Sequence, residues 1–258
     1  PSLTDAEALR RLSAGDERAV GLLDDITILD PAAGSGAFLL GALERLSAFR
    51  IAAGREAAPR AIVTRHLYGV DLNPAAVRLC ELRLWLAVIS AEADGSPDLV
   101  EPLPNLDAFV RQGDSLSDPM RLMLRHPLRS PRHATALAAA RRAAVEASGR
   151  AKREALRLLR QIELDTASER FGAAISEREA QIREILASRR DSTLFGEQRH
   201  LDPRTARALG AARRGLKELR RLRRALREEG AAPSFDFDTQ FGDVTAAGGF
   251  DLVVGNPP

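Results

Sequence analysis

The segment ITILDPAAGSGAFLL (residues 26–40) contains a strand, a glycine turn and the start of a helix in immediate succession. The apolar, β-branched run 26–30 ends at an Asp-Pro step, a pattern typical of a buried strand. Apolar side chains then recur at helical spacing, at Phe38, Leu39, Ala42, Leu43 and Leu46. A strand, a glycine turn and a helix in this order open a nucleotide-binding α/β unit.

Three further segments have strand character: HLYGVDL (66–72), LDAFVRQGDSL (106–116, a strand and its turn) and FDLVVG (250–255). Asn73 and Pro74 follow the second strand and are typical of the N-cap and first turn of a helix. The predicted helix continues through residues 75–89, which are apolar on most sides, so we expect it to be well buried. Alternating strands and helices predict an α/β fold with a parallel sheet and right-handed crossovers.

Residues 134–229 differ in composition and are dominated by alanine, arginine, leucine and glutamate. Their apolar residues recur at helical spacing, in three sets: Leu137, Ala144, Ala151, Leu158 and Ile162; Ile175, Ile182, Ile185 and Leu186; Leu216, Leu219, Leu222 and Leu226. Gly149 and Gly172 are weak points in this pattern. The spacing predicts long, coiled-coil-like helices packed as a hairpin with a turn near 188–203, inserted between the third and fourth strands.

Composition limits the class of protein. The 258 residues are 45% hydrophobic with a formal charge of only +2, and no apolar run is long enough for a membrane span. Cys80 is the one cysteine, which excludes an internal disulfide framework and a cysteine-rich zinc site. We therefore expect an intracellular, cytoplasmic protein. Only Lys152 and Lys217 among the 38 basic residues are lysines, a bias that suits phosphate contacts but also follows from a GC-rich coding sequence.

Two of the strand ends carry candidate ligand-binding groups. Gly34 and Gly36 allow a tight turn in which a ligand can approach the main chain, and the Asp30 carboxylate beside them can bind an ammonium group. Asp71 ends the second strand, where an acidic residue can hold ribose hydroxyl groups. The alternatives are a purely structural turn for the glycines and a helix-capping role for Asp71.

The other two strand ends are also polar. Asp114 follows the third strand and could meet an adenine amino group, although a surface-turn role is an equal alternative. Asn256 offers an amide acceptor and donor, and Pro257 and Pro258 fix the backbone and remove two N–H donors. A rigid row of acceptors suits a planar amino group that gains positive charge as it attacks; the alternative is a simple turn.

The four motifs DPAAGSGAF, GVDLNP, QGDSL and FDLVVGNPP resemble, in order and in strand context, those of S-adenosylmethionine-dependent amino-methyltransferases. In particular, they resemble those of the gamma-class adenine-specific DNA methyltransferases of restriction–modification and related phage-defence systems. It covers residues 24–117 and 233–258, with Ala33 replacing a cysteine that is common in the family. The resemblance implies a Rossmann-like methyltransferase sheet divided into residues 1–117, a helical insertion at 118–232 and a return at 233–258.

The resemblance also implies roles for individual residues. S-adenosylmethionine would be the cofactor; its methionine part would be held by Asp30, Gly34 and Gly36, its ribose by Asp71 and its adenine by Asp114. The neighbouring cofactor-binding positions would be Pro31, Ala32, Phe38, Leu72 and Ser115. The catalytic residues would be Asn256, Pro257 and Pro258: the Asn256 side chain and the Pro257 carbonyl oxygen would accept hydrogen bonds from the amino group of an adenine flipped out of double-stranded DNA. No metal is expected.

Three family features are missing from the sequence: the aromatic residue after Asn-Pro-Pro, a cofactor motif within residues 1–25 and a target-recognition domain. These departures predict a segment of a longer protein that is inactive alone and needs a recognition domain elsewhere to bind double-stranded DNA. Restriction or defence-system subunits are possible further partners. No membrane association is expected. Two other functions stay open: methylation of a protein glutamine or an RNA base, and a noncatalytic DNA-binding or assembly module. The arginines of the helical insertion could contact phosphates or form a solvated face.

Overall fold

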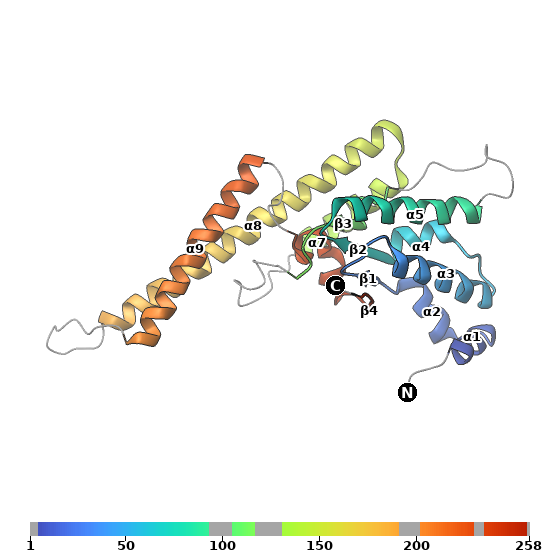
Figure 1. Ribbon diagram of the computed structural model, residues 1–258, viewed down its shortest axis with the longest axis horizontal. Coiled ribbons are helices and arrows are strands. Elements are labelled where there is room, and N and C mark those ends of the chain that lie inside the picture. Colours follow the sequence, from blue (N-terminus) through green and yellow to red (C-terminus); the bar gives the residue numbers. More distant parts are fainter. Residues whose placement is uncertain (1–4, 93–104, 117–130, 191–201, 230–234, 257–258) are drawn as a thin grey trace.

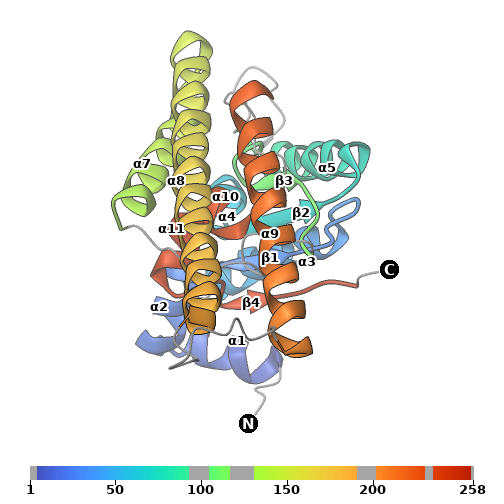
Figure 2. The same ribbon diagram turned by 90° about the vertical axis from the view of Figure 1, so that its left-hand side faces the viewer.

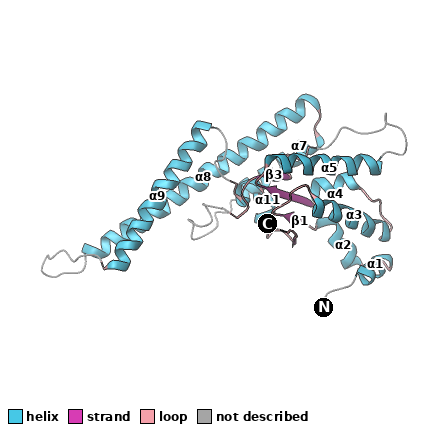
Figure 3. Cartoon of the chain, in the orientation of Figure 1, coloured by secondary structure: helices cyan, strands magenta, loops and turns pink. Residues whose placement is uncertain are grey.

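The computed structural model describes residues 5–92, 105–116, 131–190, 202–229 and 235–256 (Figure 1). The elements in chain order are α1 (Asp5–Ser13), α2 (Glu17–Asp25), β1 (Ile28–Asp30), α3 (Ala37–Ala52), α4 (Pro59–Arg65), β2 (Leu67–Asp71), α5 (Pro74–Glu92), β3 (Val110–Gln112), α7 (Pro131–Glu146), α8 (Gly149–Arg190), α9 (Pro203–Glu229), α10 (Phe237–Gln240), α11 (Gly242–Ala247) and β4 (Leu252–Val253). Helices make up most of the described chain (Figure 3).

The described strands form one parallel sheet in the order β3-β2-β1-β4. Ile28 of β1 lies opposite Leu67 of β2 on one side and opposite Leu252 of β4 on the other. The strand order therefore reverses direction between β1 and β4, and ligands of open α/β sheets bind at such a switch point, beyond the carboxyl ends of the strands. The predicted parallel sheet within an α/β fold is confirmed.

Each face of the sheet has its own core because successive strand residues point to opposite sides. Ile28 and Leu67 pack with residues of α3 and α5 on one face. Leu29 and Tyr68 pack on the other face with Phe241 and with residues of α7 and α11. The two layers of helices hold the strand ends in place.

Helices α8 and α9 form a long two-helix arm that projects away from the sheet (Figures 1 and 2). They have 42 and 27 residues, and the core between them includes Phe171, Ala174, Leu219, Leu222 and Leu226. The predicted helical hairpin is therefore present. Most of its predicted turn, residues 191–201, lies outside the described residues.

The structure divides the apolar set from Leu137 to Ile162 between two helices at Gly149, one of the predicted weak points. Helix α7 ends at Glu146 and α8 begins at Gly149, whose φ of +55° lies in the left-handed region that favours glycine. The stripe is thus shared by two helices that pack against each other. Gly172, the other predicted weak point, does not interrupt α8.

The prediction that the helix after the second strand would be well buried was wrong, and the fourth strand is exposed as well. Helix α5 buries one face only: Leu79, Leu82 and Leu86 are 46%, 47% and 55% exposed. Strand β4 has two residues, and Leu252 and Val253 are 44% and 59% exposed. The exposure of both elements follows from their positions, because β4 lies at one edge of the described sheet and α5 covers the opposite edge.

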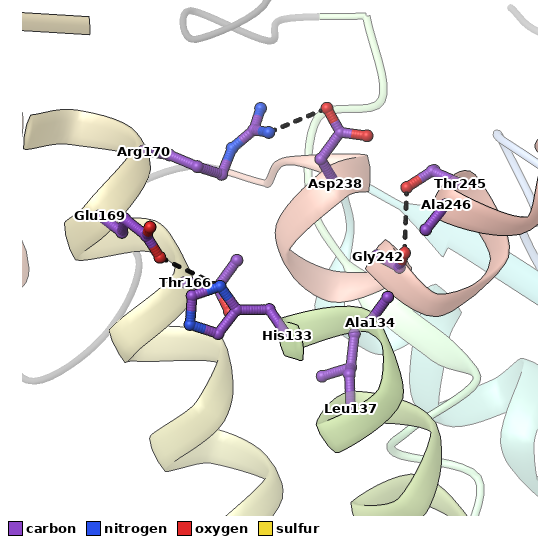
Figure 4. A pocket seen from close by; sticks show the side chains of 10 residues that line it. All are labelled: His133, Ala134, Leu137, Thr166, Glu169, Arg170, Asp238, Gly242, Thr245 and Ala246. Carbon is purple, nitrogen blue, oxygen red and sulfur yellow. Dashed lines mark hydrogen bonds and ion pairs between the residues drawn. The ribbon is translucent and has the colours of Figure 1, made fainter. Parts of the chain in front are cut away.

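Ion pairs join the arm to the sheet domain. Arg170 of α8, with its side chain 3% exposed, lies 2.9 Å from carboxylate oxygens of Asp236, the N-cap of α10, and of Asp238 within α10. Next to it, His133 of α7 lies 3.1 Å from Glu169 across a small cavity of about 20 Å³ (Figure 4). The Arg170 ion pairs fix the base of the arm against the segment that leads into β4, and the His133–Glu169 contact joins α7 to α8.

Arg141 of α7 lies at the centre of this junction. Its guanidinium donates hydrogen bonds to the carbonyl oxygens of Ala108 and Gln240 and to the Asp243 carboxylate. The same group lies 5.4–5.6 Å from the ring centroids of three aromatic residues, Tyr68, Phe109 and Phe241. Because its side chain is only 5% exposed, this arginine is a buried cation that holds α7 to the sheet.

Candidate active site

Asp30, the last residue of β1, is fully buried at the carboxyl edge of the sheet, with 0% exposure. One carboxylate oxygen accepts a hydrogen bond from the Ala32 N–H at 3.1 Å, and the other has no partner among the described residues. Burial raises the pKa of Asp30 above its usual value, and the negative charge of Asp71 adds to the increase. A buried carboxylate oxygen without a partner is suited to a cationic ligand group.

The two glycines that follow adopt left-handed backbone conformations, with φ of +53° at Gly34 and +81° at Gly36. A side chain at Gly36 would place its Cβ 2.6 Å from the Sγ atom of Cys80 in α5. Gly36 therefore allows α3 to begin in direct contact with α5, a packing requirement that the motif did not reveal. The neighbouring Gly34 has more space and orients its N–H toward the second strand end.

Asp71 joins the first and second strand ends. One of its oxygens accepts from the Gly34 N–H at 2.8 Å, and the other accepts from the Asn73 N–H at 2.8 Å. The helix cap of α5 is instead provided by Asn73, whose Oδ1 accepts from the Ala75 N–H at 2.9 Å. Capping therefore does not account for the position of Asp71, and each of its oxygens keeps a lone pair for a ligand.

The third strand end approaches the first through Ser115. Its hydroxyl donates a hydrogen bond of 2.7 Å to the carbonyl oxygen of Pro31. Asp114 is exposed and accepts from the Leu116 N–H at 3.0 Å, a local turn contact. The structure thus brings Ser115 close to the glycine turn, whereas Asp114 lies at the solvent side of the same loop.

The fourth strand end passes directly beside Asp30. The Val254 N–H donates to the Leu29 carbonyl at 2.9 Å, and a Cβ at Gly255 would lie 3.1 Å from Asp30 Oδ1. Gly255 thus lets the chain cross the Asp30 carboxylate, a role that we did not predict although the glycine stands directly before Asn-Pro-Pro. Asn256 follows and is exposed; Pro257 and Pro258 lie outside the described residues.

Of the other predicted positions, Ala32 lies within the glycine turn and supplies the N–H that Asp30 accepts. Phe38 and Leu72 are 49% and 69% exposed at the same edge. The described residues contain no group of three or more histidine, cysteine, aspartate and glutamate side chains arranged to hold a metal ion.

The family relationship rests on most of the chain. Residues 65–258 match the family described as the Eco57I restriction-modification methylase. The chain belongs to this family. The restriction–modification methylase relationship predicted from the four motifs is therefore confirmed at the level of the family. Residues 13–106 of this Eco57I-family chain also match the MmeI DNA-methyltransferase domain, so the glycine turn and the first two strand ends lie within a second methyltransferase match.

A curated relative from Methanocaldococcus jannaschii, named as a type II restriction enzyme and methyltransferase, is 40% identical over 105 residues. The match covers 36% of the present chain and 9% of the relative, so the chain spans a small part of that protein's length. No solved structure matches the chain. Within the described residues we find no helix with the length and hydrophobicity needed to span a lipid bilayer.

Proposed function

We propose that this Eco57I-family chain carries the catalytic centre of a DNA methyltransferase that uses S-adenosylmethionine to methylate the amino group of an adenine. The observation that supports this most strongly is the convergence of four strand ends around a fully buried Asp30 with an unpartnered oxygen. When bound, the cofactor supplies an electrophilic methyl group on a sulfonium centre.

The residues at the edge suit the chemistry of this cofactor. The Asp30 carboxylate would accept hydrogen bonds from the methionine ammonium group, which would provide the partner that its free oxygen lacks. Asp71, half-buried and anchored by two backbone N–H groups, would hold the ribose hydroxyls. Ser115 and the glycine turn would shape the same edge, since both approach Pro31.

Asn256 would act on the target base. It follows Gly255, which places the chain beside Asp30, so a group held by Asn256 would lie next to the cofactor site. Its amide oxygen would accept a hydrogen bond from the adenine amino group, orient the nitrogen lone pair and stabilise the positive charge that develops there. The carbonyl oxygen of Pro257 would provide a second acceptor, and Pro258 would fix the backbone that presents it. The base would have to leave the DNA stack.

The Asp30→Asn substitution tests the cofactor site. It keeps the acceptor for the Ala32 N–H and removes only the charge, so S-adenosylmethionine affinity in the intact protein should fall about 10- to 100-fold, as expected for a lost charge-assisted hydrogen bond. The matched control is Asp251→Asn, which removes the same charge at the amino end of β4, where Asp251 accepts from Thr27. Isothermal titration should show cofactor affinity unchanged in the control; equal affinities in both variants would contradict the proposal.

The raised pKa of Asp30 gives the same site a pH dependence. Below that pKa the free carboxyl group is protonated and must release its proton to bind the ammonium group, so the affinity of the wild type should fall as the pH falls through it. The cofactor affinity of Asp30→Asn should not change with pH over that range.

The Asp30→Asn variant should also be no less stable than the wild type at neutral pH, because a raised carboxyl pKa means that the ionised form destabilises the free protein.

A further inference from the structure

Helix α9 concentrates positive charge in a chain that is nearly neutral overall. It contains nine arginines, one lysine and three glutamates, a formal charge of +7. Because the whole chain carries only +2, subtracting +7 leaves −5 on the residues outside α9. The nearly neutral total therefore conceals one strongly basic element.

Most cations of α9 are exposed and lie away from its packing contacts. Leu209, Ala212, Leu219, Leu222 and Leu226 are buried. Four exposed cations recur at intervals of four, three and four residues and so follow one stripe of the helix: Arg213, Lys217, Arg220 and Arg224. We call these four residues the α9 basic stripe. At 1.5 Å per residue it is about 16 Å long.

Pairing within the protein neutralises little of this stripe. Among the residues that the structure describes, Arg213 and Lys217 form no ion pair. Arg220 lies 2.8 Å from Glu179 of α8, and Arg224 lies 2.7 Å from Glu228, but all four partners are at least 36% exposed. Water screens exposed ion pairs and leaves them weak, so these arginines are readily available to a stronger anionic partner.

The arm lies on the same side as the candidate active site. Helices α3 and α5 begin at the strand ends that form the site and run to the right in Figure 1, whereas α9 lies to the left, beyond that edge. Figure 2 shows the view from that side, with α8 and α9 in front of the sheet. The arm therefore extends on the side of the sheet toward which the strand ends point (Figure 1).

We propose that the α9 basic stripe binds the phosphate backbone of duplex DNA next to the target base. This inference rests on the proposed function, because it takes DNA as the substrate. Duplex DNA carries one charge per ~1.7 Å along its axis, so a stripe of about 16 Å can meet several phosphates at once. Arginine suits this contact because its planar guanidinium can bind two phosphate oxygens. The contact positions the duplex without reading its sequence.

The test neutralises the stripe in the intact protein by replacing Arg213, Lys217, Arg220 and Arg224 together with glutamine. Binding to a fluorescent DNA duplex, without cofactor, is measured between about 50 and 200 mM salt. The slope of log affinity against log salt concentration should become shallower by about 2 to 4, because each lost phosphate contact removes ~0.9 from the slope. Affinity at the lower salt concentration should fall at least about tenfold. KM for DNA should rise, with cofactor affinity unchanged.

A matched control removes four exposed cations from the first turns of α8, namely Arg150, Arg153, Arg157 and Arg160, again to glutamine. Circular dichroism checks that both variants keep the wild-type helix content. A slope change confined to the α9 variant supports the inference. An unchanged slope, equal changes in both variants, or tighter binding to duplex RNA than to DNA would overturn it. Absence of methyl transfer by the wild-type protein, with the slope difference between the two variants intact, would instead reject the proposed function.

Discussion

Replacement of Asn256 by alanine is expected to lower kcat for methyl transfer to DNA about 100- to 1000-fold, the usual effect of removing one group that stabilises charge in a transition state. The amide oxygen would accept from the attacking amino group while that nitrogen gains positive charge, and alanine offers no acceptor. The reaction is followed with a labelled methyl group under single-turnover conditions in the intact protein.

The cofactor provides the control for this prediction. Asn256 is exposed and lies beyond Gly255, whereas the cofactor would be held by Asp30 and Asp71, so S-adenosylmethionine affinity should stay within about twofold of the wild type, as for an interaction made only in the transition state. A variant that transfers methyl groups at the wild-type rate would remove Asn256 from the mechanism. A variant that loses cofactor affinity instead would place Asn256 in the cofactor site.

Replacement of Arg141 by leucine should lower the free energy of unfolding by about 3–5 kcal/mol, the range measured when one partner of a buried ion pair is removed. The change leaves the Asp243 carboxylate and the carbonyl oxygens of Ala108 and Gln240 without their donor. It also removes the cation from the three surrounding aromatic rings. Urea unfolding followed by circular dichroism measures the loss.

Arg142 is the matched control because it is the next residue of α7 and is exposed. Arg142→Leu should change the free energy of unfolding by less than about 0.5 kcal/mol, as is usual for surface substitutions. Arg141→Lys should restore only part of the stability, since an ammonium group cannot reproduce the planar fork of a guanidinium. Similar losses for Arg141→Leu and Arg142→Leu would contradict the buried-cation interpretation.

The strand-turn-helix pattern at residues 26–40 was sufficient to predict the start of the parallel sheet, because it combines a buried run with glycines that need left-handed backbone. The positions of Asp30 and Asp71 could also be predicted, since each ends a strand. The contacts that these two carboxylates make could not be predicted from the sequence. Oδ2 of Asp71 accepts from Gly34 of another loop, a contact between residues 37 positions apart.

Other features depend on partners that a linear pattern does not reveal. Gly36 and Gly255 are required by Cys80 and Asp30, neither of which is adjacent in sequence. Arg141 falls within a helix whose other arginines are exposed, and only the three rings around it distinguish it. The break at Gly149 was visible as a weak point, but the return of α8 along α7 depends on packing against the sheet.

The most direct test of the central claim is the identity of the methylated nucleoside. The intact protein is incubated with duplex DNA and S-adenosylmethionine carrying an isotopically labelled methyl group, and the DNA is digested and analysed by mass spectrometry. N6-methyladenine is the predicted product, present with the wild type and nearly absent with Asn256→Ala. Label on cytosine carbon, label on protein or RNA in place of DNA, or no label from a folded protein that binds the cofactor would contradict it.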